Sequence, residues 1–266
     1  MDSLFAPVGA PDPRGMDPLW TIAVAAVATS TLSGVFGMAG GLALMAVCAG
    51  LLPVTDAMLV HGATQIVANG LRFWLLRRHV HWRGVAFFSL GSLLPLALFR
   101  AFALELDRGA LYLLLGAAPI AASLVPRGLA PRFERPGQAA LCGVLTTGGQ
   151  LSAGASGALL DVFFTRGELG RHSVVATKAC TQALGHAWKL LHFGLLAAAS
   201  PTPSSVTPAS LVAFAAAALG GTLVGRRFLD RMADGAFRAW TRRLALALSA
   251  GFVVQGARLV VTGCGR

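Results

Sequence analysis

Apolar runs divide the chain into about ten segments, separated by clusters of glycine, proline and arginine. In the first half they lie at about residues 19–35, a short piece ending at 52, 56–76, 84–99 and 109–125. In the second half they lie at about 137–147, a short piece ending at 164, 171–193, 209–225 and a last one ending near 261. The pattern predicts an all-α fold with a start at 1–18, a first half at 19–125, a proline- and arginine-rich linker at 126–136 and a second half at 137–266.

One predicted helix, Arg171–Phe193, carries polar residues on a single face. These are Lys178, Gln182, His186 and Lys189, at steps of four, four and three residues, and residues at such steps share a helix face. We call this set the second-half stripe. A charged side chain in hydrocarbon costs several kcal/mol, so the stripe should lie against protein or a watery cavity.

An equivalent set, the first-half stripe, lies 117 residues earlier in the chain. It has the same three steps and consists of His61, Gln65, Asn69 and Arg72. Glycines upstream keep the same register without a gap: Gly37 aligns with Gly154, and Gly40 with Gly157. Features that repeat in one register predict two related structural halves.

Composition indicates a membrane protein. Of the 266 residues, 55% are hydrophobic and 12% are charged, against about 25% charged in a typical soluble domain, and the mean hydropathy is +0.68. The net charge of +11 comes from arginines clustered in short loops between apolar segments, which is the positive-inside pattern. We therefore expect the lipid bilayer and a small solute as partners, and no nucleic acid.

The basic loops also predict the topology. They lie at 77–83, 127–135, 166–171 and 226–243, and placing them inside puts the amino terminus outside. Each half then has five segments, an odd number, so the halves cross the membrane in opposite senses. This is the inverted-repeat design of many secondary transporters. We expect a multi-pass protein of the cell inner membrane.

Each half has a glycine-rich break between segments that are short for spanning helices of about 20 residues. Two short helices meeting there would place a helix N-terminus at membrane depth, where its free N–H groups bind anions. The predicted helix-tip cradle for an anion consists of Gly37, Gly40, Gly154 and Gly157. The alternative is close helix packing, because small residues let membrane helices approach each other.

Three polar side chains are predicted to contact the anion: Gln65, Lys178 and Gln182. An alternative for the two glutamines is hydrogen bonding between helices. Lys178 and Lys189 would attract or gate an anion. Their alternative is snorkelling to the interface, which suits Lys189 better because it lies nearer a helix end.

His186, His61 and Asp161 are the candidates for proton coupling. Histidine titrates near neutral pH, although a histidine in a helix is more often a hydrogen-bonded interior residue. Asp161 lies in a short apolar piece, and the alternatives for it are a proton carrier and an ion pair with Lys178.

The sequence offers no sign of enzymatic chemistry. It contains no HExxH, GxSxG or P-loop motif. Its four cysteines, Cys48, Cys142, Cys180 and Cys264, have no metal-ligand spacing. We therefore expect no catalytic activity, no cofactor and no bound metal.

The chain resembles the TauE/SafE sulfite exporter family over about residues 19–194. The matching runs are GVFGMAGGLALM and HGATQ in the first half, and GASGALLDVFFTRG and VVATKACTQALGHAWKLLHFG in the second. The run ATKACTQ with the following histidine and lysine is the most specific of them, whereas GMAGG has fewer glycines than is usual in the family. The resemblance implies a permease of two related halves for small anions, often sulfite, sulfonates, thiosulfate or related organic acids.

These features together predict a permease for small anions that works by alternating access between its halves. The resemblance implies that the anion contains sulfur. Two other functions stay open: a carrier for a cation or neutral metabolite, and a membrane scaffold that transports nothing.

Overall fold

The computed structural model describes residues 18–36, 39–102, 112–113, 116–117, 120, 131–164, 167–200, 206–232 and 234–262. These residues form helices and contain no strand, so the all-α prediction is confirmed for this part of the chain. The first half contains α1 (Pro18–Phe36), α2 (Ala39–Leu51), α3 (Val54–Leu76), the short 3₁₀ helix η2 (Arg77–His79) and α4 (Trp82–Phe102). The second half contains α6 (Pro136–Ala153), α7 (Gly157–Phe164), α8 (Arg171–Ala199), α9 (Pro208–Arg231) and α10 (Asp234–Thr262).

Most helices begin and end close to the breaks that the sequence predicted, but the basic loop predicted at 226–243 is largely helical, because α9 continues to Arg231 and α10 begins at Asp234. Proline at 53 precedes α3, and proline at 136 stands at the start of α6, where its missing N–H costs no hydrogen bond. Gly154 ends α6 in the left-handed conformation, with φ 76°, and its N–H donates to Gln150 O. Most of the predicted segment 109–125, the linker up to 130, the start 1–17 and Gly37 lie outside the described residues.

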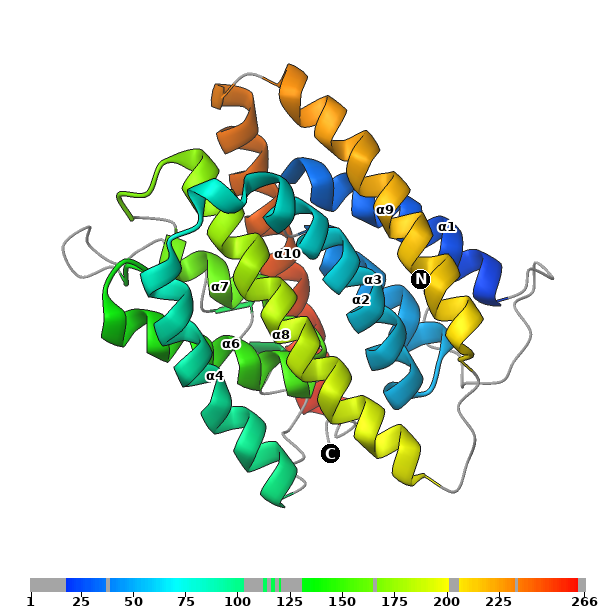
Figure 1. Cartoon of the computed structure of the whole chain (residues 1–266). Helices are drawn as coiled ribbons and strands as arrows, with labels where there is room; N and C mark the ends of the chain where they lie inside the picture. The colour runs from blue at the N-terminus through cyan, green and yellow to red at the C-terminus, as the bar shows by residue number, and fades with distance from the viewer. Residues whose placement is uncertain are drawn as a thin grey trace.

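The two halves are interleaved. The first helix of each half packs against the fourth helix of the other, so that α1 lies along α9 and α6 lies along α4. The third helices, α3 and α8, pack against each other at the centre. Figure 1 shows α1 and α9 side by side at one edge and α4 and α6 toward the other, with α3 and α8 between them.

Glycine allows the paired helices to come close. A Cβ atom at Gly91 of α4 would overlap the carbonyl oxygen of Ala140 in α6, and one at Gly143 of α6 would overlap the carbonyl oxygen of Phe88 in α4. Gly221 of α9 meets the backbone of α1 in the same way. Small residues at crossing points are typical of helix packing in membranes.

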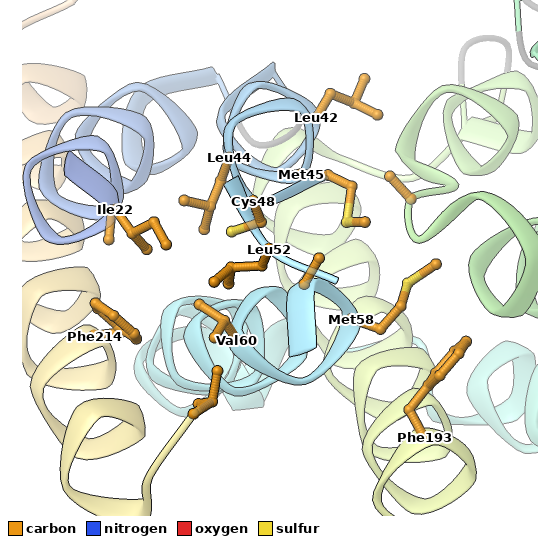
Figure 2. Packing of buried hydrophobic residues seen from close by; sticks show 14 residues of the cluster. Ile22, Leu42, Leu44, Met45, Cys48, Leu52, Met58, Val60, Phe193 and Phe214 are labelled. Atoms are coloured by element: carbon orange, nitrogen blue, oxygen red, sulfur yellow. The ribbon is translucent and has the colours of Figure 1, made fainter. Parts of the chain in front are cut away.

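An apolar cluster fills the space among α1, α2, α3, α8 and α9 (Figure 2). Ile22, Leu44 and Cys48 are fully buried there, and Phe214 reaches the cluster from α9. A second cluster joins α4, α6 and α7 through aromatic rings, among them Phe133 and Phe164, which stack with centroids 4.5 Å apart. These clusters fix the helices around the polar centre of the molecule.

Large apolar side chains cover much of the outer surface. On α4, Leu90 is 63% exposed and Leu94 is 54% exposed, and on α9 Val212 is 68% exposed. Two described helices are long and apolar enough to cross a membrane, over Trp82–Phe102 and Pro208–Phe228. The stretches Trp20–Val35 and Gly40–Ala49 are apolar but shorter.

Candidate functional site

The two glycine breaks bring the starts of α2 and α7 to the same small cavity. Its lining combines these helix starts with both polar stripes and consists of Ser33, Gly41, Leu42, His61, Gln65, Gln150, Ala155, Ser156, Gly157, Gln182 and His186. The cavity volume is about 20 Å³, which is room for about one water molecule. The N-terminal ends of two helices, whose first N–H groups have no partner within the helix, therefore lie beside one polar cavity.

The predicted glycines have different roles around this cavity. Gly157 begins α7 and lines the cavity. Gly40 instead packs against α1, because a Cβ there would overlap the carbonyl oxygen of Thr29. Gly154 needs its positive φ, and a Cβ there would come within 2.8 Å of Met58 Sδ. The packing alternative therefore applies to Gly40, and the cradle role of Gly37 stays a prediction.

The first-half stripe forms a chain of hydrogen bonds that ends at the cavity. Arg72 donates to Ser33 O at 2.7 Å and to Asn69 Oδ1 at 3.3 Å. Asn69 Nδ2 in turn donates to Gln65 Oε1 at 3.4 Å. Because an arginine can only donate, the Asn69 amide turns its oxygen toward Arg72 and its nitrogen toward the Gln65 oxygen. Gln65 is thus left with Nε2 as its free group, which is buried and has no partner among the described residues.

A second chain of hydrogen bonds comes from α6 and α7. Ser156 Oγ donates to Gln150 Oε1 at 2.9 Å, and Gln150 Nε2 lies 2.7 Å from His186 Nδ1. With its oxygen engaged by the serine, the Gln150 amide donates to Nδ1, so the ring hydrogen of His186 is on Nε2. Neither Gln150 nor Ser156 was among the predicted site residues, although each is a polar residue inside a glycine-rich break.

A buried lysine links the two halves. Lys189 has no exposed surface, and its Nζ donates to Gly154 O at 3.0 Å and lies 2.6 Å from His61 Nδ1. His61 Nε2 donates to Gly41 O at 2.8 Å. Both ring nitrogens of His61 are therefore engaged, and the lysine supports the carbonyl end of α6, where a positive charge is favourable. The alternative of Lys189 snorkelling to an interface does not fit this burial.

Lys178 lies on the same helix but away from the cavity lining. It forms an ion pair with Asp161 of α7, and the exposed fractions of the two side chains are 13% and 16%. The alternative of an ion pair for Asp161 is therefore realised in the structure. An anion contact by Lys178 would have to compete with this carboxylate, and it stays a prediction.

A second small cavity lies next to the first. Its volume is about 10 Å³. Three residues, Gln150, Ser156 and Gln182, line both cavities. The rest of its lining is rich in hydroxyl groups, from Thr146, Thr147 and Thr181. These shared side chains form the boundary between the two spaces.

Comparisons of the chain with family models, curated proteins and solved structures found no match. The resemblance to the TauE/SafE family therefore stays a prediction. It is carried by the glycine breaks and by the run ATKACTQ, of which Gln182 lines both cavities.

Proposed function

We propose that the protein is a multi-pass permease of the cell inner membrane for small anions, and that the anion contains sulfur, such as sulfite, a sulfonate or thiosulfate. The observation that carries the proposal is the cavity between the starts of α2 and α7. It combines two helix N-termini with the buried amide N–H₂ of Gln65, which has no partner in the part of the chain that the structure describes. The choice of sulfur rests on the family resemblance alone.

The distribution of polar and apolar side chains supports residence in a membrane. A soluble protein places its large apolar side chains inside and its charged ones outside. Here leucines and valines cover α4 and α9, whereas Lys189, His61 and Gln65 are at most 2% exposed. Polar groups inside a membrane protein usually mark a substrate or ion pathway. The two apolar helices of spanning length agree with this proposal.

The helix order supports a repeated architecture. Helices α1, α2 and α3 begin at residues 18, 39 and 54, and α6, α7 and α8 begin at 136, 157 and 171, which is 118, 118 and 117 residues later. The two outer helix pairs are also equivalent. In each pair the first helix of one half packs against the fourth helix of the other, as α1 with α9 and α6 with α4. We infer inverted repeats from this equivalence and from the predicted odd number of segments in each half.

The polarity of the cavity supports an anion rather than a cation. A cation needs free carbonyl or carboxylate oxygens. Two carbonyl groups near the site, those of Gly41 and Gly154, already accept hydrogen bonds from His61 and Lys189. The groups left over are mostly donors. A bound anion would also provide a negative charge near Lys189, which has no carboxylate within ion-pair distance among the described residues.

The way the site is shared between the halves supports alternating access. Gln65 comes from the first half, and Gln182 and His186 come from the second. The cavity has room for about one water molecule, so a larger anion can bind only when α3 and α8 move apart. Movement of one half relative to the other would open the site to each side in turn.

Ligand binding by the purified protein tests this function. Sulfite, thiosulfate or taurine at millimolar concentration should raise the melting temperature, because a ligand that binds only the folded state stabilises it. The shift should vanish in Gln65→Met, which keeps the side-chain length but removes the donor. The absence of a shift with all three anions would contradict the proposal.

A further inference from the structure

A buried basic pair joins the two central helices of the molecule. Lys189 of α8 and His61 of α3 are at most 1% exposed, and Lys189 Nζ lies 2.6 Å from His61 Nδ1. The carbonyl oxygen of Gly41 can only accept, so His61 Nε2 donates to it. The carbonyl oxygen of Gly154 accepts from Lys189 Nζ in the same way. The space between Nδ1 and Nζ then holds a single shared hydrogen.

The uncharged form of this pair satisfies each of these contacts. A neutral amine has two hydrogens, of which one is donated to Gly154 O and the other to His61 Nδ1. The ammonium form has a third hydrogen, which has no partner among the described residues, and no described carboxylate lies within ion-pair distance of its charge. The pair can therefore gain or lose one proton without breaking a contact. A second proton would place hydrogens of both groups between Nδ1 and Nζ.

The surroundings of Lys189 provide no negative charge that would hold the ammonium form. In the described part of the chain, the titratable side chains that interact electrostatically with Lys189 are Cys48 of α2, His61 of α3 and His186 of α8. None of these is a carboxylic acid, and α6 contributes the uncharged carbonyl of Gly154. The carboxylate of Asp161 on α7 is paired with Lys178 instead. A compensating negative charge therefore has to come from a bound anion.

The pair is placed where an anion and the movement of the helices both act on it. His61 lines the first cavity. This cavity has room for about one water molecule, so an anion enters only when α3 and α8 part, and it acts on the pair through its charge. A lone buried charge is costly. The empty protein avoids this cost by closing around the neutral pair, and the loaded protein avoids it by closing around the ammonium and the anion together.

We propose that the pair of Lys189 and His61 is the proton-binding site of the permease, and that it takes up one proton with each anion. The proton comes from the water on the side to which the site is open and converts the amine to the ammonium. On the other side the anion and the proton leave together, and the amine is restored. A monovalent anion then crosses without net movement of charge. This inference rests on the proposed anion permease and adds its coupling ion.

Calorimetric titration of the purified full-length protein with thiosulfate counts the protons. Thiosulfate is the probe because, unlike sulfite, it does not titrate near neutral pH. The heat is compared in buffers of different ionisation enthalpy, since each proton drawn from the buffer adds the heat of the buffer. At alkaline pH, where the empty pair is neutral, the wild type should take up close to one proton, and the dissociation constant should rise about tenfold per pH unit. At acid pH the empty pair already carries its proton, so the uptake should approach zero.

Three variants identify the group responsible. Lys189→Arg keeps a positive charge that is not lost at any accessible pH, so it should bind thiosulfate without proton uptake and with a dissociation constant independent of pH. Lys189→Met is the second variant for the case that the larger arginine disturbs folding, and it should bind more weakly but also without proton uptake. His186→Gln changes the other histidine of the cavity and should keep an uptake close to one proton.

The outcomes separate the inference from the function on which it rests. Thiosulfate binding by the wild type without proton uptake at any pH would overturn the proton site and leave the permease proposal in place. The same holds for an undiminished uptake in a folded Lys189 variant, or for an uptake that is lost in His186→Gln and kept in Lys189→Arg. A failure of the wild type to bind thiosulfate, sulfite or taurine at any pH would overturn both.

Discussion

Replacing Lys189 by methionine should weaken anion binding with little effect on stability. The lysine is fully buried, and its Nζ contacts Gly154 O at 3.0 Å and His61 Nδ1 at 2.6 Å. Methionine fills a similar volume without the charge or the donor. The variant therefore asks whether this buried group serves the ligand or the fold.

The effect on stability is the difference of two opposing contributions. The variant leaves two acceptors without their donor, at about 1–3 kcal/mol each. It also removes a buried charge that has no carboxylate partner among the described residues, and the desolvation of such a charge costs several kcal/mol. The two contributions are similar in size, so the free energy of unfolding should change by less than about 2 kcal/mol.

The effect on binding is larger. His61 both contacts Lys189 and lines the cavity, so one ring separates the ammonium group from a bound anion. A unit charge about 6 Å away contributes about 3 kcal/mol at an effective dielectric constant of 20. The dissociation constant for sulfite should therefore rise roughly 100-fold.

Calorimetric titration with sulfite and the melting temperature of the same samples measure the two effects. Lys178→Met is the comparison variant, because it leaves Asp161 without its ion-pair partner. Loss of one partner of a largely buried pair costs up to about 3–5 kcal/mol, so this variant should melt at a lower temperature, and any loss of its affinity for sulfite would measure the predicted anion contact of Lys178. Unchanged sulfite binding in Lys189→Met would refute the reasoning.

Two further predictions concern packing and topology. Gly221→Ala should lower stability by about 1–3 kcal/mol, because its Cβ would overlap the backbone of α1. Gly220→Ala is the control, and because the space around it is open it should be neutral or stabilising by up to about 1 kcal/mol. Equal melting temperatures of the two variants would contradict the close α1–α9 contact. A membrane-impermeant maleimide added to intact cells should label Thr207→Cys in the loop predicted to be outside and leave His79→Cys in the basic loop unlabelled; the reverse labelling would invert the proposed topology.

The sequence was sufficient to predict the helices and the inward face of the first-half stripe. Steps of four, four and three residues place side chains on one face whatever the tertiary structure, and His61, Gln65, Asn69 and Arg72 are all buried. The prolines and glycines at the breaks likewise act through local backbone geometry, as Gly154 does with its positive φ.

Contacts between distant segments could not be predicted in this way. The pair of Lys189 and His61 joins residues 128 positions apart, and periodicity does not specify which helices pack together. For the same reason the ion pair of Lys178 with Asp161 was one of two open alternatives for that aspartate until the structure placed α7 beside α8. Gln150 and Ser156 were missed because a break in the helical pattern carries no periodicity from which to infer their direction.

Sulfite flux into proteoliposomes tests the central claim most directly. Liposomes containing the purified wild type should take up radiolabelled sulfite in a saturable manner, and Gln65→Met should reduce the rate at low sulfite at least about tenfold, the equivalent of one hydrogen bond to a charged ligand. The matched control is Gln255→Met on α10, a residue outside the lining of both cavities, and its rate should equal that of the wild type. Uptake no faster than in empty liposomes, or a full rate in Gln65→Met, would contradict the account.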